Sequence, residues 1–175
     1  MSSIIQQSEI VIDAPIAEVW KLFAEEFAEI DKWSSSVSAS QSAGNPINTL
    51  DYSERACEIS AAGFNDTKER ILTYDEPHQL TYSLYDGLPG FVKNAENTWT
   101  FEEQAGKTKV VGQTEMEVSG ILGFIMGGFM KRSLKSALDQ MTREAKYFIE
   151  NGRPHPDKVK AMEKLAKKQA RLAPA

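Results

Sequence analysis

The chain has 175 residues, a net charge of −5, 41% hydrophobic residues and 26% charged residues, which suits one soluble globular domain and excludes intrinsic disorder. Its single cysteine, Cys57, excludes an internal disulfide and a cysteine-based zinc site, and favours a reducing, cytoplasmic setting. We find no signal peptide and no stretch of roughly 18 apolar residues that would span a membrane.

The charge is unevenly distributed along the chain. From Asp157 onward there are six basic and two acidic residues, which leaves 14 basic and 23 acidic residues before it. An acidic body disfavours nucleic acid as a partner, because phosphate binding needs a basic surface. The basic end is typical of a solvated helix; the alternatives are a weak contact with an anionic surface and a homodimer.

The first elements are a strand followed by short helices. Residues 8–12 alternate in the manner of a strand. Pro15 then suits the first turn of a helix. An apolar stripe at helical spacing follows, and a second short helical turn is expected up to Trp33. The residues of that stripe are Val19, Leu22, Phe23 and Phe27.

The pattern between Val37 and Val118 changes to strands. Five segments alternate with period two and are separated by short turn sequences, so we expect antiparallel hairpins. These segments are residues 53–61, 67–74, 79–85, 95–102 and 107–118.

A long amphipathic helix is predicted for residues 120–151. Asn151-Gly152 followed by Pro154 is a strong signal for its end. Residues 157–172 have a weaker helical pattern, so we expect a domain over residues 1–152 and a basic, helical tail over residues 153–175. The apolar face of the long helix comprises Leu122, Met126, Phe129, Leu134, Leu138, Met141, Ala145 and Phe148.

The apolar face of this helix needs a partner, and one face of the sheet is the available surface. We therefore predict an α+β helix-grip fold. Its curved antiparallel sheet has six to seven strands around the long C-terminal helix, and two short helices follow the first strand. A sheet that grips one helix leaves space between the two, where small ligands bind.

Several short segments carry a resemblance to a known group of proteins. They are Ile12-Asp13-Ala14-Pro15 with Val19-Trp20, Lys32-Trp33, and Glu69-Arg70-Ile71-Leu72 leading through Asp75-Glu76 to Leu80-Thr81-Tyr82. With the order of elements over residues 8–151, they resemble the START-like (SRPBCC) superfamily, and within it the polyketide cyclase/dehydrase type. The resemblance implies the fold and a ligand cavity but not one activity.

Strand alternation selects the residues that face this cavity. Arg55 shares a face with Cys57, and Glu69 shares a face with Ile71. Along residues 95–102 two parities remain open, one of which turns Asn97 inward. The candidate ligand-binding residues on strands and helix are Arg55, Glu69, Ile71, Tyr82, Asn97, Trp99, Met126, Phe129, Met130 and Leu134.

The plant abscisic-acid receptors of the same superfamily resemble the central strands more closely. Arg55 and Glu69 stand at positions that match an arginine and a ligand-facing glutamate of those receptors, and Tyr82 matches a cavity phenylalanine. Residues 61–66 lack the receptors' Ser-Gly-Leu-Pro gate, and residues 34–38 offer no lysine to pair with a ligand carboxylate.

Two interpretations of the polar residues stay open. Arg55 and Glu69 either orient the oxygen atoms of a ligand or pair with each other and stabilise the sheet. Residues 126–130 either form an adaptable gate or belong to the core. His78 and His155 are expected to be exposed in turns, away from any cluster with metal-ligand spacing, so no metal site is predicted.

The predicted function is binding or transport of a small hydrophobic or aromatic metabolite or lipid, with no cofactor. The alternative is a polyketide cyclase/dehydratase-type enzyme in which Glu69 or Tyr82 acts as general acid or base. A third hypothesis is an interaction protein that uses its basic C-terminal helix.

Overall fold

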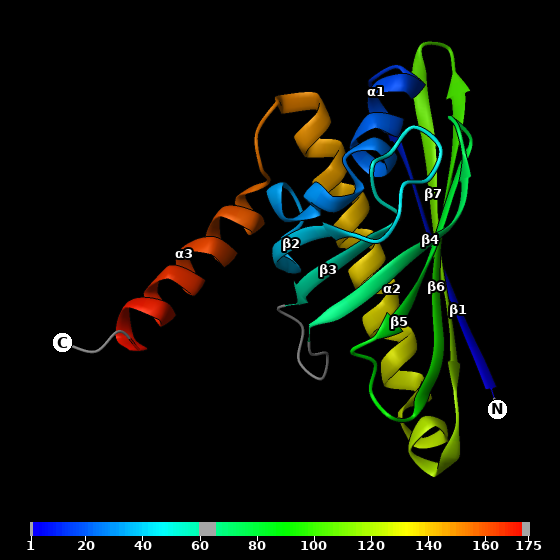
Figure 1. The fold of residues 1–175 in the computed structure, drawn as a ribbon, viewed down its shortest axis with the longest axis vertical. Coiled ribbons are helices and arrows are strands. Elements are labelled where there is room, and N and C mark those ends of the chain that lie inside the picture. The colour runs from blue at the N-terminus through cyan, green and yellow to red at the C-terminus, as the bar shows by residue number, and fades with distance from the viewer. Residues whose placement is uncertain (1, 60–65, 173–175) are drawn as a thin grey trace.

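The computed structural model of this protein describes residues 2–59 and 66–172, apart from the side chains of residues 121–126 and 172. The described residues form seven strands, two long α-helices and three short helical segments (Figure 1). In chain order they are β1 (Ser2–Ile12), α1 (Ile16–Trp20), the π-helical η1 (Lys21–Glu25), the 3-10 helix η2 (Phe27–Lys32), β2 (Val37–Ala43), β3 (Glu54–Ile59), β4 (Thr67–Asp75), β5 (Gln79–Asp86), β6 (Val92–Gln104), β7 (Lys107–Val118), α2 (Gly120–Asn151) and α3 (Pro156–Leu172).

The strands form one antiparallel sheet with the order β1-β7-β6-β5-β4-β3-β2. In Figure 1 the long strands β1, β6 and β7 lie on one side, and α2 runs across the sheet toward the short helices that follow β1. This arrangement confirms the predicted helix-grip fold.

Alternation along β6 and β7 places large apolar side chains between the sheet and the helices. Trp99 and Phe101 are buried, which confirms the parity that also includes Asn97. Opposite Trp99 stands Gly112, where a Cβ atom would overlap the indole ring. The glycine therefore makes room for the largest side chain of the core.

The sheet is longer at its edges than the sequence indicated. β1 begins at Ser2 rather than at residue 8, and β2 adds a seventh strand over residues that are mostly serine and alanine. Both segments lack a long apolar alternation, because each lies at an edge of the sheet and β2 is largely solvent-exposed.

Helix α2 has the predicted bounds. Gly152 adopts a left-handed conformation with φ of 64° and donates its backbone N–H to the Phe148 carbonyl, which ends the helix. The expectation that Phe129 faces the core is wrong, since its side chain is 67% exposed. Its neighbour Met130 is buried instead, because Met130, Leu134 and Leu138 follow each other at the i, i+4 spacing of the helix face.

Helix α3 projects away from the body of the protein (Figure 1). Its first turn contacts the body, where the Lys158 ammonium is buried and donates to the Val37 carbonyl at 2.7 Å. None of the helices in residues 2–59 and 66–172 is long and apolar enough to cross a membrane.

Candidate ligand-binding site

The charged residues of the predicted site pair with each other. Arg55 on β3 stands directly opposite Glu69 on β4, and both side chains are buried. Arg55 Nε and Nη2 lie 2.6 and 2.5 Å from Glu69 Oε2, and Nη1 donates to the Phe27 carbonyl at 2.5 Å. Burial lowers the pKa of Arg55, but the charge and hydrogen bond of Glu69, together with Tyr82 and Cys57, outweigh burial and hold the pKa above its ordinary value.

Aromatic rings enclose this ion pair. The guanidinium lies 3.8 Å from the centroid of the Phe27 ring and 5.0 Å from that of Tyr82. The Tyr82 hydroxyl accepts a long hydrogen bond of 3.5 Å from Trp99 Nε1. Burial raises the pKa of Tyr82 to about 12, so at neutral pH this hydroxyl is protonated and can donate a hydrogen bond.

An internal cavity lies beside these groups, with a volume of about 10 Å³, which is roughly the space of one water molecule. Its lining is mainly aromatic and aliphatic, and Arg55, Tyr82 and Trp99 of the predicted set contribute to it. The full lining comprises Leu22, Phe23, Phe27, Ile30, Trp33, Arg55, Tyr82, Trp99 and Met141.

Trp33 is a cavity residue that the sequence did not reveal. The side chain is 3% exposed. Among the described residues, the indole Nε1 has no hydrogen-bond partner. A buried donor without a partner is unfavourable, so a water or a ligand oxygen that reached this N–H would satisfy it.

The other predicted site residues lie elsewhere in the interior or at the surface. Ile71 is buried beside Tyr82, its partner in the register of β4 and β5. Asn97 accepts a hydrogen bond of 2.5 Å from Thr114 Oγ1. Met130 and Leu134 belong to a second apolar cluster with Ile4, Val92, Ala95, Met116 and Val118.

Two predictions fall on residues without a full description. The side chain of Met126 lies outside the described residues, so its place in the site stays a prediction. The absence of the receptors' Ser-Gly-Leu-Pro gate concerns residues 61–66, and residues 61–65 lie outside the described residues.

A surface groove of about 380 Å³ lies next to the internal cavity, between α2 and the turn before β2. Exposed Phe129 lines this groove rather than the core. Met141 lines both the groove and the internal cavity, so the two spaces adjoin at this residue. The lining of the groove comprises Ser34, Ser36, Phe129, Arg132, Ser133, Ser136, Ala137, Gln140, Met141 and Glu144.

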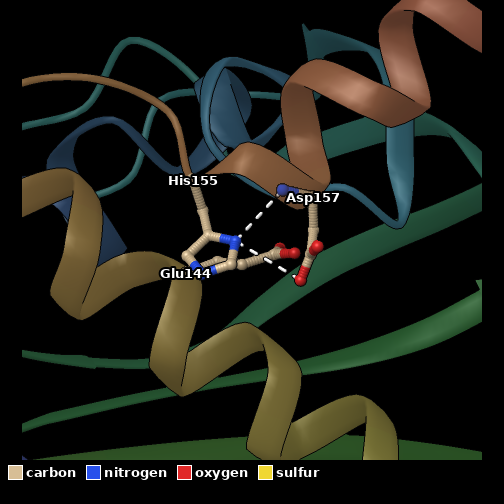
Figure 2. A group of neighbouring side chains, drawn as sticks. All are labelled: Glu144, His155 and Asp157. Atoms are coloured by element: carbon tan, nitrogen blue, oxygen red, sulfur yellow. Dashed lines mark hydrogen bonds and ion pairs between the residues drawn. The ribbon is translucent and has the colours of Figure 1, made fainter.

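At one end of this groove, Glu144 approaches His155 and Asp157 (Figure 2). One potential metal-ligand atom from each of the three lies within 4.8 Å of the others, which corrects the expectation that His155 stands apart from any such cluster. The three residues come from α2, the linker and the first turn of α3, a meeting that sequence spacing alone does not reveal.

The hydrogen bonds of this cluster favour a structural role. Glu144 accepts from Ser35 N, Ser35 Oγ and Gln140 Nε2 at 2.8, 2.6 and 3.0 Å. The Asp157 backbone N–H donates to His155 Nδ1 at 3.1 Å, as Figure 2 shows. Beside the cluster, Arg143 on α2 lies 3.5 Å from Asp157 and ties the start of α3 to α2.

The fold and the internal cavity define a helix-grip protein of the START-like superfamily. Residues 4–146 match the family described as polyketide cyclase/dehydrase and lipid transport, and the chain belongs to that family. No curated protein sequence matches the chain.

Solved structures share the fold at low sequence identity. TTHA0849 from Thermus thermophilus is 15% identical, with a TM-score of 0.68 over 83% of this chain and 96% of that one. A point mutant of Thalictrum norcoclaurine synthase, in complex with a transition-state analogue, is 13% identical, with a TM-score of 0.65 over 85% and 94% of the two chains. The di-domain ARO/CYC StfQ from the steffimycin biosynthetic pathway is 11% identical, with a TM-score of 0.69 over 85% of this chain and 51% of that one.

Proposed function

We propose that this protein binds or carries a small, largely apolar molecule between the sheet and α2. The observation that carries the proposal is a cavity lined by aromatic residues, one of which, Trp33, has a buried indole N–H without a partner among the described residues. Such a lining suits a hydrophobic or aromatic ligand, and a few polar groups suffice to orient it. The family description, which includes lipid transport, supports the same class of function.

The end of the ligand that enters the cavity is expected to present an oxygen atom to Trp33 and Tyr82. Both side chains line the cavity, and each can donate to an oxygen atom of the ligand. Arg55 and Glu69 then act indirectly, because their ion pair holds Phe27 and Tyr82 in position. In this arrangement the ion pair shapes the site and the two neutral donors bind the ligand.

Ligand entry requires Met141 to move. A cavity of about 10 Å³ cannot hold a metabolite, whereas ligand pockets usually measure about 300–1,000 Å³. The groove of about 380 Å³ begins on the other side of Met141. Methionine has three flexible torsions and repacks at low cost, so its rotation would join groove and cavity.

Substitution of Met141 tests this proposal. Met141→Trp should fill the passage and weaken binding of the neutral dye Nile red by about tenfold or more, a change of about 1.4 kcal/mol. Met141→Leu keeps the volume and should bind like the wild type. Met162→Trp on α3 controls for an added indole. Equal dye affinity for Met141→Trp and the wild type, with the fold retained by circular dichroism, would contradict this route.

A cyclase/dehydratase-type enzyme is the second candidate, and the family description favours it. Tyr82 would then be the proton donor, because its hydroxyl belongs to a residue that lines the cavity, whereas Glu69 is paired with Arg55. An enzyme would lose turnover but keep substrate affinity in Tyr82→Phe. A carrier has no turnover to lose, so in Tyr82→Phe only its affinity for the ligand would fall.

A further inference from the structure

The outer part of α2 carries positive charge next to the groove. Lys131, Arg132, Lys135 and Arg143 line a shallow hollow of about 680 Å³, and all four are exposed. Arg132 lines both this hollow and the groove that leads to Met141. The two depressions are therefore continuous at Arg132.

Two of these cations have a carboxylate partner, whereas Lys131 and Arg132 have none among the described residues. Lys135 pairs with Asp139 on the same helix, and Arg143 lies 3.5 Å from Asp157. Within residues 2–59 and 66–172, no carboxylate oxygen lies within 4.0 Å of a charged nitrogen of Arg132. Its guanidinium is therefore available to an anion in the groove.

The groove changes in character along its length. At the Arg132 end it has a free guanidinium and the hydroxyls of Ser133 and Ser136, whereas Met141 at the other end leads to the apolar cavity. Buried Glu144 also lines the groove, and its negative charge disfavours an anion close to it. A ligand with one anionic end would therefore keep that end at Arg132.

We propose that the groove selects amphiphiles with an anionic headgroup, a carboxylate or a phosphate, which Arg132 binds while the apolar body passes Met141. A guanidinium suits this role because its parallel N–H groups match the oxygen atoms of both headgroups. The inference rests on the proposed function and adds the class of ligand.

Two probes with the same apolar body test this inference: dansyl-undecanoic acid and its uncharged methyl ester. The wild type should prefer the acid, and Arg132→Gln should weaken acid binding about threefold to tenfold, as expected for a partly exposed charge-assisted contact. Ester binding should stay unchanged. Arg171→Gln, an exposed arginine on α3, is the matched control and should bind both probes like the wild type.

Dodecyl phosphate and inorganic phosphate distinguish the sources of the anion. Dodecyl phosphate should displace the acid probe at micromolar concentration, whereas inorganic phosphate, which lacks an apolar body, should not. Displacement by inorganic phosphate alone at the same concentration would overturn the amphiphile assignment. Equal binding of acid and ester would overturn the inference and leave the proposed function intact. Failure of the wild type to bind either probe would overturn both.

Discussion

The strongest electrostatic contact of the interior joins two neighbouring strands. Arg55 and Glu69 are only 4% and 6% exposed, and each is the other's counter-charge. Removal of one partner leaves a buried charge without compensation, which costs far more than the pair itself contributes.

Glu69→Gln should therefore destabilise the fold by about 3–5 kcal/mol, measured by urea denaturation. The control lies one residue away in the same strand pair, where Glu54 binds the exposed Arg70. Glu54→Gln should cost less than about 1 kcal/mol. If Glu69→Gln and Glu54→Gln lower the free energy of unfolding by the same amount, the Arg55–Glu69 pair is not the buried contact described above.

The hydroxyl of Tyr82 provides a pH-dependent test of the same region. Burial raises its folded-state pKa to about 12 from an ordinary value of 10.0, so the folded state holds the proton more tightly than the unfolded state. The resulting stability is complete below pH 10 and is lost as the pH rises toward 12. It amounts to about 2–3 kcal/mol.

Denaturation at about pH 9 and about pH 11.5, on either side of the unfolded-state pKa, measures this loss. The variant Tyr82→Phe separates it from the titration of lysines. The free energy of unfolding of the wild type should fall more steeply with pH than that of Tyr82→Phe. Parallel pH profiles for the two proteins would show that Tyr82 titrates like an exposed tyrosine.

At the scale of elements, the first turn of α3 contacts the body through Lys158 and Asp157. Lys158 is buried, and burial lowers its pKa, while Val159 and Met162 further along are exposed. The sequence predicted a basic, helical tail over residues 153–175, and this turn is where the described part of that tail forms hydrogen bonds and ion pairs with the body.

Two truncations separate the attached turn from the projecting part of α3. A chain that ends after Asn151 loses the Lys158–Val37 hydrogen bond and should melt a few degrees lower, on the scale of about 1 kcal/mol. A chain that ends after Leu165 keeps that bond and should melt with the full-length protein. Loss of soluble expression in the chain that ends after Leu165 would show that the part of α3 beyond Leu165 also packs against the body.

Helices and strands were predictable where the residues within the element determine its position and its ends. The bounds of α2 follow from its apolar spacing and from Gly152, which supplies a left-handed end to the helix. β2 was not among the five alternating segments, because its serines and alanines give no apolar alternation and its pairing with β3 is a tertiary contact.

The site was predictable only in part. Alternation along the strands placed Arg55, Tyr82 and Trp99 inside, and all three line the cavity. Alternation cannot show which polar groups satisfy each other, so the pairing of Arg55 with Glu69 and the unpartnered N–H of Trp33 became visible only in three dimensions.

At the scale of the whole molecule, the fold encloses an apolar interior and leaves a groove beside it. An acidic body and a projecting basic helix complete the molecule (Figure 1). Contact of residues 153–175 with an anionic surface or a second copy stays a prediction. The central claim concerns the interior, where a ligand oxygen should meet Trp33.

The indole N–H signals of the three tryptophans test this claim in a single NMR titration. Each of Trp20, Trp33 and Trp99 has an indole N–H that gives its own signal in a ¹H–¹⁵N NMR spectrum. Trp33 and Trp99 line the cavity, whereas Trp20 is equally buried, also lacks a partner among the described residues, and is not part of the lining.

Titration with dansyl-undecanoic acid methyl ester, whose dansyl end carries sulfonyl oxygens as acceptors, should shift the Trp33 signal downfield as its N–H gains a hydrogen bond. The Trp99 signal should move less, and the Trp20 signal should stay in place. A ligand that saturates the protein while the Trp33 signal stays unchanged, or while only Trp20 shifts, would contradict the proposed site.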